Sequence, residues 1–138
     1  MSEGNFALDP RLATDTVPVA SLALCNVLLM NDARYPWLIL APRRAGLVEI
    51  ADLSTEEQAT LWLEVNRAAA ALRTVAPCDK LNLGALGNIV RQLHVHVVAR
   101  CVGDAAWPGP VWGNGNTEPY QPAAREVLLD DLRKTLTP

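Results

Sequence analysis

The alternation of apolar and polar residues predicts a strand-rich first half of the chain. Residues 21–30, SLALCNVLLM, form a short run rich in Leu and Val, and residues 37–42, WLILAP, form a second such run. The polar segment NDARYP between them contains turn-forming residues, so we expect the two runs to pair as a hairpin. The connection that follows has room for one further short strand at residues 47–50.

The longest predicted helix follows this region and has clear start and stop signals. Ser54 is followed three residues later by Glu57, which is the spacing of a capping box. Pro77 ends the segment, because proline cannot continue the backbone hydrogen bonds of a helix. Four apolar residues recur at helical spacing: Leu61, Val65, Ala68 and Leu72. We expect these residues, together with Trp62, to face the core.

The remaining segments of the chain give weaker predictions of secondary structure. Asp9 as an N-cap and Pro10 at the first helical position predict a short helix or turn over residues 9–15. We then expect, after the long helix, two strands at 80–86 and 90–100 with a Gly-Asn turn between them, a loop rich in Gly, Pro and Trp at 101–120, and a closing helix that begins with Pro122.

Composition indicates an ordinary globular chain in a reducing compartment. Its 138 residues suffice for one domain with a proper core, and half of them are apolar. A net charge of -3 gives no reason to expect nucleic acid or a membrane as a partner. The three cysteines have no motif spacing, which favours free thiols, with Cys25 buried and unreactive. The polar amino terminus does not resemble a signal peptide, and the apolar runs are too short to span a bilayer, so we expect a cytoplasmic protein.

The only two histidines of the chain lie one residue apart in QLHVHVV. Side chains alternate between the two faces of a strand, so His94 and His96 are expected to share a face with Gln92. Two neighbouring imidazoles can act on one anion, one attacking while the other donates a hydrogen bond or a proton. Two other interpretations stay open: histidines that are merely tolerated on an exposed face, and a metal site completed by Asp104 or by a partner chain.

The segment LNLGALGNIVRQLHVHVVAR resembles the signature of the histidine-triad (HIT) nucleotide hydrolases and transferases. In that signature a glycine-rich turn leads into a strand with His-x-His-x-His, and Gln92 stands here at the first histidine position. The upstream order is also similar to the family: an apolar strand ending in ND, a return through LILAP and a helix after DLSTEEQ. The resemblance covers roughly residues 24–100.

This resemblance implies an α+β fold of the HIT type, with an antiparallel meander sheet, one long helix packed on it and a C-terminal helix. It also implies a homodimer. From the length of the chain we expect a single domain over residues 1–138, and we expect no cofactor. The implied partner is a nucleotide or a dinucleoside polyphosphate.

The resemblance also implies a covalent mechanism. His94 would attack the α-phosphorus of a phosphoanhydride or phosphoramidate, and water would then hydrolyse the nucleotidyl-histidine. His96 would bind phosphoryl oxygens or help to protonate the leaving group. In the family a backbone carbonyl at the first motif position holds the nucleophile's second ring nitrogen, and Gln92 retains that carbonyl. Because an amide cannot transfer a proton near neutral pH, Gln92 should affect leaving-group or phosphate chemistry more than the attack itself.

Seven positions match substrate-contacting positions of the family. The turn GALGN allows close approach of backbone amides to a phosphate, and the acid in NDARYP matches one that binds ribose hydroxyls. The alternative that both segments only form turns, without contacting a substrate, stays open. The implied substrate-binding residues are Asp32, Asn82, Gly87, Asn88, Ile89, Val90 and Arg100.

Several residues depart from the family pattern. Trp37 and Ala45 replace frequent histidines, and Ile89 replaces a frequent Ser or Thr, which removes polar phosphate contacts. Trp107 and Trp112 would either wall a ligand or an interface, or simply pack onto the sheet. The departures leave two alternatives to catalysis: a non-catalytic nucleotide-binding protein on the same scaffold, and a small metal-binding module.

Overall fold

The predicted α+β fold is confirmed, because the protein is built on a five-stranded antiparallel sheet. The computed structural model describes residues 4–136, so both ends of the predicted 1–138 domain lie outside the described residues. The strands are β1 (Thr16–Ser21), β2 (Cys25–Met30), β3 (Trp37–Pro42), β4 (Lys80–Gly84) and β5 (Val95–Arg100). Their order in the sheet is β1-β2-β3-β5-β4, so only the first three form a consecutive meander and β5 is a central strand.

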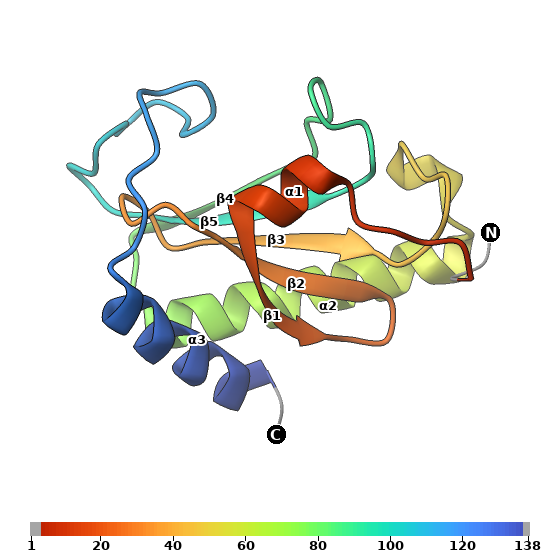
Figure 1. Cartoon of the computed structure of the whole chain (residues 1–138), viewed down its shortest axis with the longest axis horizontal. Helices are drawn as coiled ribbons and strands as arrows, with labels where there is room; N and C mark the ends of the chain where they lie inside the picture. Colours follow the sequence, from red (N-terminus) through yellow and green to blue (C-terminus); the bar gives the residue numbers. More distant parts are fainter. Residues whose placement is uncertain (1–3, 137–138) are drawn as a thin grey trace.

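Helices cover both faces of this sheet, as Figure 1 shows. The long helix α2 (Thr55–Val75) and the closing helix α3 (Pro122–Leu136) lie on one face, whereas the short α1 (Pro10–Asp15) lies on the other. A single 3-10 turn, η1 (Ile50–Asp52), precedes α2. Within residues 4–136, no helix is long and apolar enough to cross a membrane.

The core is divided by the sheet into two clusters. The larger cluster lies under α2 and α3 and includes Leu38 of β3 and Val97 of β5. The smaller cluster lies on the α1 face and includes Leu12 and Trp37. Because both faces are covered, β3 and β5 are buried along their whole lengths. Cys25 is fully buried in the larger cluster, and burial raises the pKa of its thiol, as expected for an unreactive cysteine.

The long helix α2 has the predicted start and stop. The Ser54 hydroxyl accepts a hydrogen bond from the Glu57 N–H at 3.1 Å, and the Glu57 carboxylate accepts one from the Ser54 N–H at 3.2 Å. The helix ends at Val75, two residues before Pro77. The expectation that Trp62 lies in the core is wrong, since 44% of it is exposed. Leu61 faces the core. Trp62 follows it by one residue, which is a rotation of about 100° around the helix axis, so its side chain lies on the flank of α2.

The strands differ from the sequence-based expectation in several places. β2 begins at Cys25 rather than at residue 21, and β4 ends at Gly84 rather than at residue 86. Strand β1 is absent from the sequence-based prediction, because Pro18 weakens its strand signal; proline is tolerated here at the edge of the sheet, beside a register shift. No strand forms at residues 47–50. β5 begins at Val95 rather than at residue 90, because the chain bends around Gln92 before it joins the sheet.

Candidate active site

His94 and His96 lie side by side where β5 begins. His94 directly precedes the strand and His96 is its second residue. The centroids of the two rings are 4.9 Å apart, and each residue is only 6% exposed. Val95, between them, belongs to the core cluster under α2. The two imidazoles therefore meet on the α1 face of the sheet.

The backbone of Gln92 fixes the protonation pattern of His94. Its carbonyl oxygen lies 2.7 Å from Nδ1 of His94. A carbonyl can only accept, so Nδ1 must carry the ring proton. Nε2 then keeps its lone pair, which is the state that a histidine nucleophile requires.

Trp37 fixes the opposite pattern on His96. The indole Nε1–H of Trp37 donates to Nδ1 of His96 at 3.0 Å. Because the indole nitrogen is only a donor, Nδ1 of His96 must be unprotonated and the ring proton lies on Nε2. Burial, reinforced by the neighbouring His94, lowers the pKa of His96 to about 3. His96 is therefore a neutral imidazole at physiological pH, with an Nε2–H to donate.

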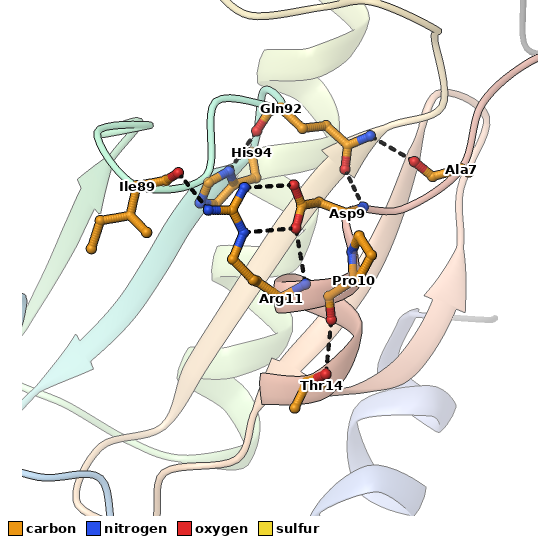
Figure 2. A network of polar contacts seen from close by, with 8 residues as sticks. All are labelled: Ala7, Asp9, Pro10, Arg11, Thr14, Ile89, Gln92 and His94. Atoms are coloured by element: carbon orange, nitrogen blue, oxygen red, sulfur yellow. Dashed lines mark hydrogen bonds and ion pairs between the residues drawn. The ribbon is translucent and has the colours of Figure 1, made fainter.

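The side chain of Gln92 turns away from the histidines and holds the amino-terminal segment (Figure 2). Its Oε1 accepts from the Asp9 N–H, and its Nε2 donates to the carbonyl of Ala7, both at 2.8 Å. The Asp9 carboxylate caps α1 through the Arg11 N–H, and the pKa of Asp9 is held low by its hydrogen bonds from Arg11. Arg11 in turn donates to the carbonyl of Ile89 at 3.0 Å. The amino-terminal segment is thus hydrogen-bonded to Ile89 and to Gln92, which both lie between the glycine turn and His94.

Two cavities flank His94. The first, which we call the apolar cavity, has a volume of about 390 Å³ and is walled by Leu12, Met30, Trp37, Ile39, Val90 and Trp112, with both histidines. The second, which we call the polar cavity, has a volume of about 470 Å³ and is lined by Glu49, Asn88, Arg91, Gln92 and His94, among others. His94, Gly87 and Asn88 line both cavities, so His94 and the glycine turn lie between them.

The structure brings most of the predicted site residues together. Gly87 has a φ of 69°, the left-handed conformation that favours glycine, and it places the turn next to His94. Ile89 and Val90 line the apolar cavity beside both histidines. Trp112 also lines that cavity and contacts His96, with ring centroids 5.4 Å apart.

Three predicted residues lie outside both cavities. The buried carboxylate of Asp32 accepts hydrogen bonds from the Arg34 backbone and guanidinium and from the Glu118 N–H. Burial opposes ionisation of Asp32, but these hydrogen bonds outweigh it and hold its pKa below the ordinary value. Arg100, at the far end of β5, binds Asp104 through two 2.8 Å hydrogen bonds and donates to the amide oxygen of Asn82 at 2.8 Å. Their substrate-binding roles stay predictions.

Sequence reasoning missed several residues that shape the site. Arg34 lines the apolar cavity and is held there by Asp32 and by the carbonyl of Asn114. Leu12 on α1 and Ile39 on β3 also face it. Ile39 pairs with His96 across the sheet, so a correct strand register would have placed Trp37 and Ile39 on the histidine face. Among residues 4–136, no group of three His, Cys, Asp or Glu side chains is arranged to hold a metal ion.

Comparison with known proteins relates this chain to proteins of one family. The HIT domain family model matches residues 12–102 of the chain. A histidine triad protein from Sinorhizobium meliloti 1021 is 47% identical, with a TM-score of 0.94 over 97% of this chain and 99% of that one. A histidine triad protein from Marinobacter aquaeolei VT8 is 43% identical, with a TM-score of 0.93 over 96% and 97% of the two chains.

One relative with a described activity is more distant. It is the bifunctional bis(5'-adenosyl)-triphosphatase/adenylylsulfatase FHIT of Arabidopsis thaliana, which is 27% identical over 106 residues. The match covers 73% of this chain and 56% of that protein, so the chain spans little more than half the length of this relative.

Proposed function

This chain belongs to the histidine-triad (HIT) domain family, and from this premise we propose that it binds a nucleotide and hydrolyses a nucleotidyl bond through His94. The substrate would be a nucleoside phosphoanhydride or phosphoramidate, or a dinucleoside polyphosphate. The Arabidopsis relative, whose name describes cleavage of such nucleotides, supports this substrate class.

The proposed reaction runs in two steps. Nε2 of His94 attacks the α-phosphorus, the bond to the leaving group breaks, and a nucleotidyl-histidine forms. The proton on Nδ1 stays in its hydrogen bond to the Gln92 carbonyl, which stabilises the positive charge that develops on the ring. Water then attacks phosphorus and returns the electron pair to Nε2, releasing a nucleoside monophosphate. The Nε2–H of His96 donates to a phosphoryl oxygen in both steps.

The single observation that carries the proposal is the 2.7 Å contact between His94 Nδ1 and the Gln92 carbonyl. It directs the basic nitrogen of a 6%-exposed histidine toward the two cavities rather than toward the backbone. The apolar cavity, with its aromatic and aliphatic walls, suits a nucleoside, and the glycine turn beside His94 suits a phosphate.

A second candidate function is nucleotide binding without catalysis. It is favoured by the side chain of Gln92, both polar ends of which are engaged by Ala7 and Asp9. This side chain cannot assist the departure of a leaving group, so the site has one proton-transferring residue fewer than a motif with three histidines would supply.

The test is acid-sensitive covalent labelling with a nucleotide labelled at the α-phosphate. Our proposal expects label on the wild type and none on His94→Ala, with Val127→Ala, an exposed position on α3, labelled like the wild type. Thermal shift with the same nucleotide reports binding separately, since any ligand of the folded state raises the Tm. Binding without label in the wild type would favour the second candidate.

The predicted homodimer and cytoplasmic location stay part of the proposal. The same holds for the expectation that residues 1–138 act as one domain.

A further inference from the structure

We propose that this site releases only leaving groups that depart as stable anions, such as phosphate, sulfate or carboxylate, and does not release amines or alkoxides. The inference rests on the proposed function and narrows its substrate class to nucleotidyl anhydrides. Its basis is that neither His96 nor Gln92 can transfer a proton to the leaving group.

Trp37 removes His96 as a proton donor of useful strength. Its indole N–H donates to Nδ1 of His96 at 3.0 Å. In an imidazolium Nδ1 would also carry a proton, so two N–H groups would face each other and repel. The ring is also enclosed by Trp112 and by Trp37 itself, at centroid distances of 5.4 and 5.6 Å, which disfavours the charged form. A neutral imidazole that gave up its Nε2–H would become an imidazolate, which is not accessible at neutral pH. His96 can therefore donate a hydrogen bond but cannot transfer its proton.

Gln92 cannot replace it. Its carboxamide is not an acid, and both of its polar atoms are bound to the amino-terminal segment at 2.8 Å. The proton on His94 Nδ1 is likewise committed to the Gln92 carbonyl on the side of the ring away from the reacting nitrogen.

The other ionisable side chains around the histidines do not change this result. Within residues 4–136, those that line the two cavities are Asp15, Arg34, Glu49 and Arg91. Arginine retains its proton under all ordinary conditions, and ionised carboxylates only accept hydrogen bonds. A leaving group must therefore depart without a proton from the protein.

The consequence for the chemical step can be written with its charges. The lone pair of His94 Nε2 forms the N–P bond, the P–O bond to the leaving group breaks, and the leaving oxygen takes the electron pair as an anion. In the second step a water oxygen bonds to phosphorus, the N–P pair returns to His94, and the water's proton passes to solvent. An amine or alkoxide would have to leave as a strong base, whereas a phosphate, sulfate or carboxylate does not.

The first test compares leaving groups on the wild type. A series of adenosine 5'-phosphoryl compounds carrying sulfate, pyrophosphate, substituted phenolates and an alkylamine is assayed at pH 7.5. We expect kcat/KM to fall on the order of tenfold for each unit by which the pKa of the leaving group rises, with the alkylamine compound at least a hundredfold slower than the anhydrides. Similar rates for the amine and the anhydrides would overturn the inference.

The second test reads the tautomer of His96 directly, and this readout does not depend on turnover. Nitrogen NMR of the histidine rings should show His96 as the neutral Nε2–H tautomer throughout pH 5 to 8. Trp37→Phe removes the indole donor and should give a mixture of His96 tautomers, and in assays it should reduce the rate gap between anhydride and amine substrates. Trp112→Phe is the matched control, because Nε1 of Trp112 has no hydrogen-bond partner among residues 4–136; it should leave the His96 tautomer unchanged.

These tests separate the inference from the proposed function. A wild type that forms no adduct and cleaves nothing would contradict the proposed function. An imidazolium or an Nδ1–H tautomer of His96 at pH 7 would overturn the inference, whether or not the protein hydrolyses any nucleotide. If Trp37→Phe does not fold, the wild-type spectrum and the leaving-group series still decide the question.

Discussion

At the scale of single residues, two hydrogen bonds set opposite tautomers on neighbouring histidines. The Gln92 carbonyl accepts from Nδ1 of His94, whereas the Trp37 indole donates to Nδ1 of His96. One ring thereby presents a lone pair and the other presents an N–H. The backbone carbonyl is independent of the side chain at position 92, which frees that side chain for the contacts with Ala7 and Asp9.

Gln92→Ala should destabilise the fold while leaving His94 and its backbone partner in place. The substitution leaves the Asp9 N–H and the Ala7 carbonyl without their partner, and we expect a loss of about 1–3 kcal/mol in unfolding free energy. Urea unfolding measures this loss. Gln58→Ala, which removes one hydrogen bond to the Leu53 carbonyl, is the control and should cost less. A Gln92→Ala protein as stable as the wild type would show that the tie to the amino-terminal segment contributes nothing.

A second residue-scale prediction concerns acid stability. The hydrogen bond from Arg100 holds the pKa of Asp104 below its ordinary value, so the unfolded chain takes up this proton at higher pH than the folded protein does. The contribution of Asp104 is therefore complete at neutral pH. It declines as the pH falls below about 4, the pKa range of an unfolded aspartate, toward the lowered folded value.

Asp104→Asn should remove this contribution. We expect the variant to lose about 1–3 kcal/mol at pH 7, because the buried Arg100 is left without its anionic partner. Its unfolding free energy should then differ less between pH 7 and pH 3 than that of the wild type. Urea unfolding at both pH values provides the measurement, and Asp130→Asn, at an exposed position on α3, is the control. Parallel pH profiles of Asp104→Asn and the wild type would contradict this assignment.

At the scale of elements, local signals in the sequence located α2 but not the contacts of the site. Ser54 and Glu57 marked the start of α2 because a capping box is complete within four residues. The alternation around His94 and His96 identified the histidine strand for the same reason. The bond between Trp37 and His96, by contrast, joins residues 59 positions apart, and that between Gln92 and Ala7 joins residues 85 positions apart. Neither follows from a local pattern, because strand register and chain packing determine both.

Asp32 illustrates the same limit within a single turn. Its position after β2 matched a ligand-binding residue of the family. Its carboxylate, however, accepts hydrogen bonds from Arg34, two positions later, and from the distant Glu118 N–H. The sequence places Arg34 near Asp32, but only the fold shows that the guanidinium also reaches the Asn114 carbonyl and lines the apolar cavity.

The capping box of α2 gives an element-scale prediction. Ser54→Ala removes the acceptor for the Glu57 N–H, and we expect a loss of about 1 kcal/mol in unfolding free energy. Thermal or urea unfolding would detect it. Thr55→Ala, at the exposed first residue of the helix, changes a neighbouring side chain outside the cap and should have a smaller effect. Equal losses for the two variants would argue against the cap as the source of the stability.

At the scale of the whole molecule, Trp62 of α2 and Leu83 of β4 are two large apolar residues that are exposed. Trp62 and Arg67 lie about 140° apart around α2, and Arg67 donates to the carbonyl of Leu136, so Trp62 lies on the flank away from α3. Leu83 of the edge strand β4 is 46% exposed and faces the same side of the sheet as Val97. An edge strand and an exposed tryptophan are features that a partner subunit can cover.

The predicted homodimer can be tested on this flank. If Trp62 is buried between subunits, Trp62→Lys should shift sedimentation toward the monomer, because a charge would be desolvated in the interface. Val127→Lys, on the exposed side of α3, introduces the same charge elsewhere and should leave the oligomeric state unchanged. A wild type that sediments as a monomer at all micromolar concentrations would refute the dimer, and a dimer insensitive to Trp62→Lys would place the interface elsewhere.

Trp112 lies in the segment between β5 and α3, which contains neither strand nor helix, yet it forms part of the wall that faces His96. The two histidines thus lie at the start of β5, whereas this part of their surroundings comes from a separate stretch of chain. Descendants of one ancestral gene can change this stretch, and with it the shape of the apolar cavity, while the histidine pair stays the same.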